Sequence, residues 1–425
     1  MLRPYRDILS KPGALAFSAT GVLARLPISM VGIGIVLMVS AEYGSYGLAG
    51  RVSAVYVIAA AACGPQLARF VDTHGQARIM RPAIALAIAG LAALIAVTLQ
   101  GAHPGWLYVT AVVAGAPSGS FGSLVRARWS YVLGDPRQLH TAYSLESALD
   151  EVVFVVGPVL ATVLATSVAS AAGLVVPILA LLVGGYLFLS LVGTEPPAQA
   201  RATDAAGRRT RRGSVIRAPG MLVLVAVFVA IGSIFGATDV ATVAFAQERG
   251  SKASAGFVLA SFALGSMLSG LGYGARHWVT PLWKRFAIGV VALAAGVSLF
   301  FLATNIPALA VVMFVTGFAI APTLINGNGL VQYCVPPDRL TEGLTWVGTS
   351  LGIGVSVGSS IAGVLIDDRG SRGGFAVVGA AAGFAVAATL VSLRTLRKAN
   401  PAPAFSSVRD PAPAEDDVGP PRRDE

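Results

Sequence analysis

The chain has 425 residues, of which 55% are hydrophobic and only 12% are charged, and its mean hydropathy is +0.73. Soluble globular chains have about 25% charged residues, so this composition excludes a disordered protein, a disulfide-stapled secreted domain and a coiled coil, and it argues against a soluble enzyme. The net charge of +10 would suit nucleic-acid binding, but the placement of the basic residues favours a membrane protein.

Apolar stretches long enough to span a bilayer recur along the whole chain. A hydrocarbon core about 30 Å thick needs roughly 20 apolar residues in a helix, because lipid offers no partner to unpaired backbone groups. The sequence therefore predicts twelve helical spans. They cover residues 13–38, 47–68, 80–99, 105–125, 141–166, 171–193, 220–246, 254–274, 286–303, 306–330, 341–366 and 373–393.

Basic residues gather on one side of this topology. The polar start from Met1 to Lys11 has no cleavable signal pattern, so we expect the first span to be its own insertion signal. With alternating spans, most of the 31 Lys and Arg residues fall on the side of the N-terminus, including Arg126 and Arg128 in a loop after the fourth span. The positive-inside rule then predicts a multi-pass protein of the inner (plasma) membrane with both termini cytoplasmic and no nucleic-acid partner.

Polar segments divide the chain into parts. Residues 194–219 contain the cluster Arg208–Arg212 and are expected to form a flexible cytoplasmic linker. They separate an N-terminal six-helix unit at 1–193 from a C-terminal six-helix unit at 220–398. The stretch 399–425 is rich in Pro, Asp and Glu, which predicts a disordered cytoplasmic tail.

The two six-helix units resemble each other in sequence. Residues 139–164 overlay residues 340–365, and the identities include Gly157 with Gly358 and Leu164 with Leu365. Both stretches begin at corresponding spans with the same orientation. This parallel repeat predicts an all-α membrane protein built from two pseudo-symmetric six-helix bundles.

Charged residues inside the predicted spans are the first candidates for function, because each costs about 2.5–3.5 kcal/mol near the bilayer centre. Arg25 lies near the middle of the first span, and Glu146, Asp150 and Glu151 lie in the fifth. We expect Arg25 to pair with Asp150 or Glu151. The cluster is interpreted either as a proton-coupling or substrate site or as a fixed structural pair, and Glu146 either joins it or extends to the interface.

The later spans hold further polar candidates. Asp239, late in the seventh span, is expected to serve the cavity or a gate, and Arg51 is expected to pair with Glu42 or Asp239 or to lie at the interface. In the tenth span, Asn326 and Asn328 either line the cavity and bind polar substrate groups or form hydrogen bonds between helices.

Two further features concern the fifth and eleventh spans. Gly157 and Pro158 interrupt the fifth span, where the missing amide hydrogen of proline predicts a kink. Glu342 lies at the start of the eleventh span and is interpreted as an ordinary interfacial acid.

The stretch from Gly64 to Arg78, placed between the second and third spans, resembles the signature loop of the major facilitator superfamily. The family pattern Gly-x-Leu-Ala-Asp-Arg-x-Gly-Arg-Arg is kept at Asp72 and Gly75, with Arg78 displaced by one place. In the fifth span, the acid, Phe and Gly-Pro within residues 147–158 resemble a form frequent in drug-exporter-like members.

The resemblance implies an alternating-access transporter of two six-helix bundles. It also implies that Asp72 contacts the helix of the eleventh span and, with Arg78, latches the inward-closed state, because a helix N-terminus favours an anion. The alternative is an ordinary tight turn, in which Asp72 caps the helix and Gly75 supplies a positive φ.

The leading prediction is a secondary active transporter of a small molecule, driven as an exporter by proton antiport. The alternatives are a proton-coupled importer of a small metabolite and a non-transporting membrane sensor of the same fold. Scattered histidines and a single acidic pair between spans, Asp367 and Asp368, argue against a membrane enzyme, so we expect no catalytic residues, metal or cofactor. The expected partners are a small-molecule substrate, protons and the lipid bilayer, with the chain as a monomer.

Overall fold

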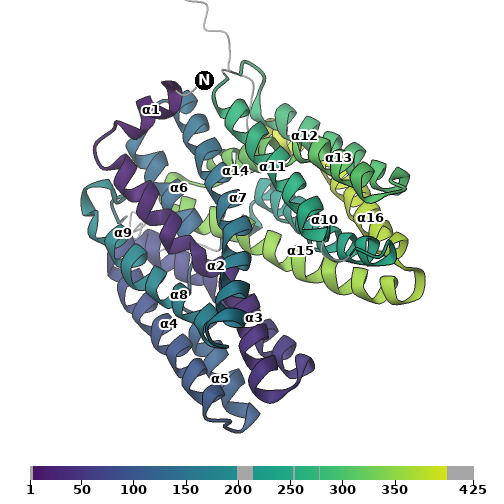
Figure 1. The fold of residues 1–425 in the computed structure, drawn as a ribbon. Coiled ribbons are helices and arrows are strands. Elements are labelled where there is room, and N and C mark those ends of the chain that lie inside the picture. The colour runs from purple at the N-terminus through teal and green to yellow at the C-terminus, as the bar shows by residue number, and fades with distance from the viewer. Residues whose placement is uncertain (1–2, 199–213, 252–253, 277, 400–425) are drawn as a thin grey trace, which may run out of the picture.

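The computed structural model describes residues 3–198, 214–251, 254–276 and 278–399. The central part of the linker, with Arg208–Arg212, and all but the first residue of the predicted tail lie outside these described residues. Within them the fold is helical, and eleven helices are long and apolar enough to cross a membrane. Figure 1 shows the helices gathered into two bundles.

The helices of the first bundle follow the predicted order. They are α1 (Arg3–Leu9), α2 (Ala14–Tyr43), α3 (Tyr46–His74), α4 (Gln76–Leu99), α5 (Pro104–Gly115), α6 (Phe121–Val132), α7 (Pro136–Ser167), α8 (Ala172–Ala180) and α9 (Tyr186–Ser190), with the π-turn η1 (Leu181–Gly185) joining the last two.

The second bundle repeats this plan after the linker. Its helices are α10 (Pro219–Glu248), α11 (Ser254–Gly274), α12 (Leu282–Ser298), α13 (Ile306–Gly317), α14 (Ile320–Cys334), α15 (Leu340–Arg369), α16 (Ser371–Val391) and α17 (Leu393–Ala399), with short 3-10 turns η3 (Val215–Arg217), η4 (Leu299–Leu302) and η5 (Pro337–Arg339). We call the end of the molecule that carries α1 and the starts of α2, α4, α7 and α10 the N-face.

Each bundle has its own hydrophobic core. Phe17, Trp129 and Phe188 are fully buried in the first, and Phe286 and Phe375 are buried in the second. Other large apolar side chains remain exposed on the outer faces of the helices, as expected where lipid replaces water as solvent. The apolar sequence thus supplies both an inner core and an outer surface.

The sequence repeat corresponds to equivalent positions in the two bundles. α7 packs on α2, and α15 packs on α10. At Gly157 of α7 an added Cβ would lie 2.0 Å from Ser29 Oγ, and at Gly358 of α15 it would lie 2.2 Å from the backbone oxygen of Ser233. The aligned glycines therefore both mark places where two helices approach too closely for any side chain.

Two stretches differ from the predicted segmentation. The signature stretch is mostly helix, because α3 continues to His74 and only Gly75, with φ of +94°, separates it from α4. The fourth predicted span divides into α5 and α6 of 12 residues each. Ser120 caps α6, which continues past the predicted end at 125. The placement of Arg126 and Arg128 in a loop was therefore wrong, since both are buried in α6.

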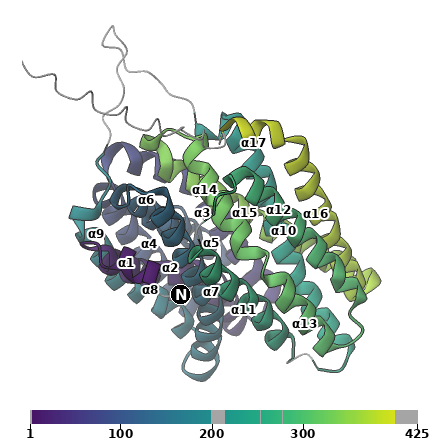
Figure 2. The same cartoon turned by 90° about the horizontal axis from the view of Figure 1, so that it is seen from above.

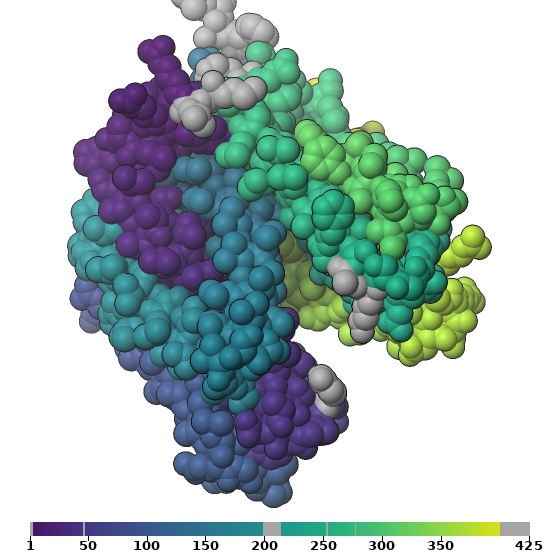
Figure 3. Space-filling view, in the orientation of Figure 1, coloured from purple at the N-terminus to yellow at the C-terminus, as the bar shows by residue number. Residues whose placement is uncertain are grey.

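The two bundles meet at the N-face and part towards the opposite end. α11 packs on α7, and α15 packs on α3. Seen from above in Figure 2, the helices of the two halves lie side by side. In the space-filling view of Figure 3 the halves touch at the end that carries α1, and a hollow opens between them at the other end. The described conformation is therefore closed at the N-face and open at the opposite face.

Candidate functional site: a buried charge network and the contact between the bundles

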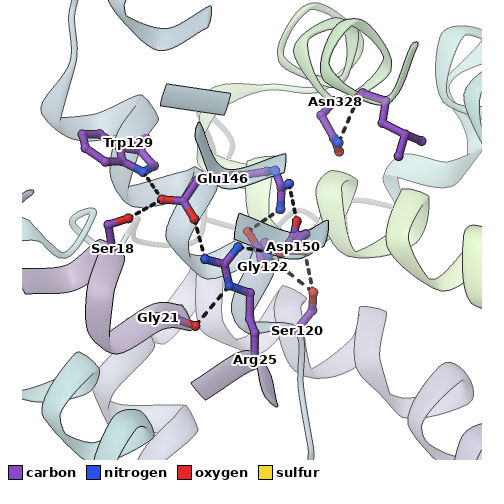
Figure 4. A network of polar contacts seen from close by, with 12 residues as sticks. Ser18, Gly21, Arg25, Ser120, Gly122, Trp129, Glu146, Asp150 and Asn328 are labelled. Atoms are coloured by element: carbon purple, nitrogen blue, oxygen red, sulfur yellow. Dashed lines mark hydrogen bonds and ion pairs between the residues drawn. The ribbon is translucent and has the colours of Figure 1, made fainter. Parts of the chain in front are cut away.

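Four charged side chains from α2, α6 and α7 form one network inside the first bundle (Figure 4). Arg25 donates to Glu146 Oε2 at 2.5 Å and to Asp150 Oδ1 at 2.6 Å. Arg126 donates to Asp150 Oδ2 at 2.7 Å. Glu146 and Asp150 are four residues apart on α7, so one helix face presents both carboxylates to the two arginines. The network pairs two positive charges with two negative charges.

Glu146 is the most enclosed member of this network. Its side chain is 0% exposed, and Oε1 accepts hydrogen bonds from Ser18 Oγ and Trp129 Nε1, each at 2.7 Å. Together with Arg25 these donors satisfy both carboxylate oxygens, which a buried charge requires. Glu146 therefore joins the network and does not extend to the membrane interface.

Arg126 is the member that the sequence analysis missed. It is 8% exposed, and it also donates to the backbone oxygen of Gly122 at 3.2 Å. The available signal was that Arg126 and Arg128 alternate with the apolar Ala127 and Trp129 directly after an apolar span, without a Gly or Pro to end the helix. Because the predicted fourth span ends at residue 125, Arg126 falls in the predicted loop that follows it.

Glu151 belongs to a different set of contacts. It is the next residue along α7, so its side chain is turned by about a quarter of the helix circumference away from Asp150. Its Oε1 accepts a hydrogen bond from Ser266 Oγ of α11 at 2.6 Å. The predicted pairing of Arg25 is thus found with Asp150 and not with Glu151, which instead connects the two bundles.

Further hydrogen bonds between the bundles lie closer to the N-face. Thr141 Oγ1 donates to the backbone oxygen of Gly274 at 2.8 Å, and Gln332 Nε2 donates to Tyr143 Oη at 2.7 Å. Thr141 and Tyr143 lie in the first two turns of α7, whereas Glu151 lies about 12 Å further along the helix. The Glu151–Ser266 bond is therefore the innermost of these contacts.

Asp72 supplies the contact on the other side of the N-face. Its Oδ2 accepts a hydrogen bond from the backbone N–H of Glu342 at 2.9 Å, in the first turn of α15. An anion at a helix N-terminus is stabilised by the unpaired amides and the helix dipole. The contact that the family resemblance implies for Asp72 is thus present. Arg78 is exposed, and within the described part of the chain we find no hydrogen bond or ion pair for it.

Tyr5 of α1 adds a bond from the first bundle to the end of α11. Its Oη donates to the backbone oxygen of Leu271 at 2.5 Å. Burial raises the pKa of the Tyr5 phenol to about 12, because the charged form would lose its hydration. At neutral pH the phenol therefore remains a hydrogen-bond donor.

Tyr273 is a second centre of polar contacts that the sequence analysis did not single out. Its Oη accepts from Asn326 Nδ2 at 2.9 Å and from Arg285 at 3.3 Å, and its ring meets the imidazole of His140 edge-on. Asn326 is 0% exposed. Its amide therefore joins α14 to α11, which is the helix–helix alternative. Asn328 is half-buried and donates to the backbone oxygen of Leu324 at 3.0 Å.

Glu342 is not an interfacial acid. It is 1% exposed, and its carboxylate accepts from Ser214 Oγ at 2.7 Å, from the backbone N–H of Val215 at 3.2 Å and from Arg339. Ser214 and Val215 are the first residues described after the central linker. The residue whose backbone binds Asp72 thus also holds the returning end of the linker.

The remaining predicted residues lie apart from the network. Arg51 Nε donates to Tyr108 Oη at 3.2 Å, and Glu42 accepts from Ser170 at 2.6 Å, so neither forms the predicted pair. Asp239 is exposed, late in α10. α7 continues as helix through Gly157 and Pro158, and the predicted kink there remains a prediction.

Comparison with known proteins supports the architecture. The sequence pattern of the Major Facilitator Superfamily matches residues 17–296 and 283–416. No curated protein sequence matches the chain. A bacterial homologue of the iron transporter ferroportin in an outward-facing state is similar in structure, with a TM-score of 0.70 and 14% identity over 91% of this chain and 98% of that chain.

A second solved structure is the human organic anion transporter MFSD10 (TETRAN), with a TM-score of 0.69 and 14% identity over 89% of this chain and 98% of that chain. At this identity the two likenesses show the fold alone. The family match covers most of the chain and agrees with the two-bundle helical architecture. The chain therefore belongs to the Major Facilitator Superfamily of membrane transport proteins.

Proposed function

We propose that this protein is a secondary active transporter that exports a small molecule in exchange for protons. The observation that carries the proposal is the position of Glu151. Its carboxyl forms the innermost of the hydrogen bonds described between the bundles, further from the closed N-face than the bonds of Thr141 and Tyr143. The surroundings of a proton-binding group at this point change when the cleft opens and when the bundles separate.

The two sets of carboxyls have different partners. Glu146 and Asp150 are held by arginines, whereas the partner found for Glu151 is a serine hydroxyl. Arginine favours the ionised form of a carboxyl, and a hydroxyl can donate to the ionised form or accept from the protonated form. We therefore assign the exchanged proton to Glu151 and a structural role to the pair of Arg25 and Glu146.

In an alternating-access cycle, the contacts between the bundles at the N-face must break before this face can open. Opening of the N-face requires the bonds of Asp72 with Glu342, Thr141 with Gly274 and Glu151 with Ser266 to break together. We assign the N-face to the cytoplasm of a cell whose inner membrane holds the protein, because the basic residues gather there. The described conformation is then outward-open. The working unit is a monomer, and nucleic acid is not a partner.

Proton flux in liposomes tests the proposal. Purified protein is reconstituted with a pH-sensitive dye inside, a pH gradient is imposed, and a panel of cationic, neutral and anionic organic compounds is added. We expect at least one compound in whose presence protons flow down the imposed gradient while the compound crosses the membrane in the opposite direction. Movement of compound and protons in the same direction would favour the importer. A folded protein that gives no compound-dependent flux would favour the non-transporting sensor.

A matched pair of variants makes the test specific. Glu151→Gln keeps the size of the side chain and an acceptor for Ser266 but cannot exchange a proton. Asp367→Asn changes an exposed acid in the last turn of α15, at the opposite face. We expect the first variant to abolish compound-dependent proton flux and the second to leave it unchanged.

A further inference from the structure

Beyond the first turn of each helix, the exposed and half-buried charged side chains of α7 and α10 are carboxyls, whereas the two arginines of the network are buried. Arg25 and Arg126 are 4% and 8% exposed, and both are bound to Asp150. Asp150 is 28% exposed at its side chain, Glu151 is half-buried, and Asp239 is exposed. A solute that enters the cleft therefore meets negative groups before it meets positive ones.

The geometry of α10 directs Asp239 towards this cleft. α10 contacts both α11 and α15, and each of these two helices packs on the first bundle. Asp239 follows Phe235, whose ring contacts Phe262 of α11, by four residues. It follows Gly236, which packs against the backbone of α15, by three residues. The helix face between these two contacts points to the first bundle, across the opening.

An aromatic pair lies between Asp239 and Glu151 along the membrane normal. Phe235 and Phe262 have ring centroids 6.5 Å apart. Phe235 precedes Asp239 by one turn on α10, and Phe262 precedes Ser266, the partner of Glu151, by one turn on the antiparallel α11. Four residues of helix rise about 6 Å, so the two carboxyls are about 12 Å apart along the axis with the rings between them.

We propose that the cleft binds an organic cation with an apolar body, which lies against Phe235 and is recognised by Asp239. This inference deepens the proposed transport function and rests on it. Two carboxyls about 12 Å apart cannot share one metal ion, whose oxygen ligands lie within about 2.6 Å. They can flank a molecule with a positive group and an apolar part, because aromatic faces also attract cations. The arginines, already bound to Asp150, are not presented to an anion.

Two ions of the same shape and opposite charge test the inference. Radiolabelled tetraphenylphosphonium and, in separate samples, radiolabelled tetraphenylborate are offered to the purified protein in detergent, and the binding of each ion is measured by scintillation proximity. We expect saturable binding of tetraphenylphosphonium and no saturable binding of tetraphenylborate. Saturable binding of tetraphenylborate instead, or no saturable binding of tetraphenylphosphonium, would overturn the proposal.

Variants then locate the binding residue. Asp239→Asn should weaken tetraphenylphosphonium binding by about tenfold or more, because a charged contact is lost. Asp239→Glu should retain most of the affinity, and Asp367→Asn, at the opposite face, should leave it unchanged. Because Asp239 is exposed, its variants should fold, which a thermal unfolding curve verifies. Equal affinity of the Asp239→Asn variant and the native protein would remove Asp239 from the site.

This binding test is independent of transport. If tetraphenylphosphonium binds but no compound drives proton flux in liposomes, the cation site stands and the proposed transport function fails. If a neutral or anionic compound drives the flux and tetraphenylphosphonium does not bind, the transport function stands and the cation site fails.

Discussion

Glu151 of α7 accepts a hydrogen bond from Ser266 of α11 at 2.6 Å, and this bond joins the two bundles at the inner limit of their contact. The neighbouring Asp150, about a quarter of a turn away on the helix, binds Arg25 and Arg126 within one bundle. The adjacent acids Asp150 and Glu151 of α7 therefore contact different parts of the molecule. One stabilises the first bundle, and the other lies where that bundle must separate from the second.

The buried network predicts unequal effects of removing its two acids. Glu146→Gln leaves Arg25 paired with Asp150, so the free energy of unfolding should fall by about 1–3 kcal/mol. Asp150→Asn should cost about 3–5 kcal/mol, because the buried Arg126 loses the carboxylate that it binds, while Arg25 keeps Glu146. Chemical unfolding of the purified protein in detergent measures both. A larger loss for the Glu146 variant would contradict the assignment of Asp150 as the shared partner of both arginines.

A charge exchange examines the same partnership. Arg25→Glu combined with Glu146→Arg preserves the pair in reverse and should recover part of the stability that each single change removes. Arg25→Glu combined with Glu151→Arg should recover none, because the Glu151 side chain is directed to Ser266. Recovery in the second combination would show that Glu151, and not Glu146, is the partner.

The contact of Asp72 predicts a shift in conformation. Asp72→Asn removes the negative charge at the N-terminus of α15, which is worth about 0.3–1 kcal/mol and corresponds to a roughly 2- to 5-fold shift towards the state that is open at the N-face. Spin labels on cysteines introduced at Gly134 and Arg276, after replacement of the native Cys63 and Cys334, report the distance between the bundles at this face.

We expect the Asp72→Asn variant to increase the population with the longer distance between the labels. Asp7→Asn, which alters an exposed acid of α1, serves as the control and should not. An unchanged distance distribution in the Asp72 variant would show that this contact does not hold the N-face closed.

Close helix contact predicts that two glycines respond differently to alanine. At Gly236 an added Cβ would lie 2.0 Å from the backbone oxygen of Val355, so Gly236→Ala should lower the free energy of unfolding by about 1–3 kcal/mol. Gly383 of α16 has no atom within 4 Å of that position, so Gly383→Ala should be neutral or slightly stabilising. Unfolding curves of the two variants compare them directly, and equal losses would contradict the packing of α10 on α15.

The sequence predicted the order of the helices and the two bundles, because hydropathy and the repeat between the two halves can be read directly from the residue types along the chain. It also predicted that Arg25 has a partner on the fifth span, since buried charges must be paired. It did not distinguish Asp150 from Glu151, because one step along a helix turns a side chain by about 100° and only the packing of neighbouring helices decides which direction holds the partner.

The predictions of Arg126 as a loop residue and of Glu342 as an interfacial acid were wrong for a related reason. Both lie near ends of apolar runs, where the sequence alone favours a solvated charge. Arg126 is buried because α6 continues beyond the apolar stretch, and Glu342 is buried because the end of the linker folds over it. Long-range contacts of this kind, such as Ser214 with Glu342, leave no periodic signal in the sequence.

Transport by the Glu151→Gln variant in liposomes, measured for a compound that the flux panel identifies, tests whether Glu151 carries the exchanged proton. We expect this variant still to exchange labelled for unlabelled compound at equal pH, because Gln can accept the hydrogen bond from Ser266, but no longer to accumulate the compound when a pH gradient is imposed. Accumulation driven by the pH gradient at the native rate in this variant would contradict the claim that Glu151 carries the proton.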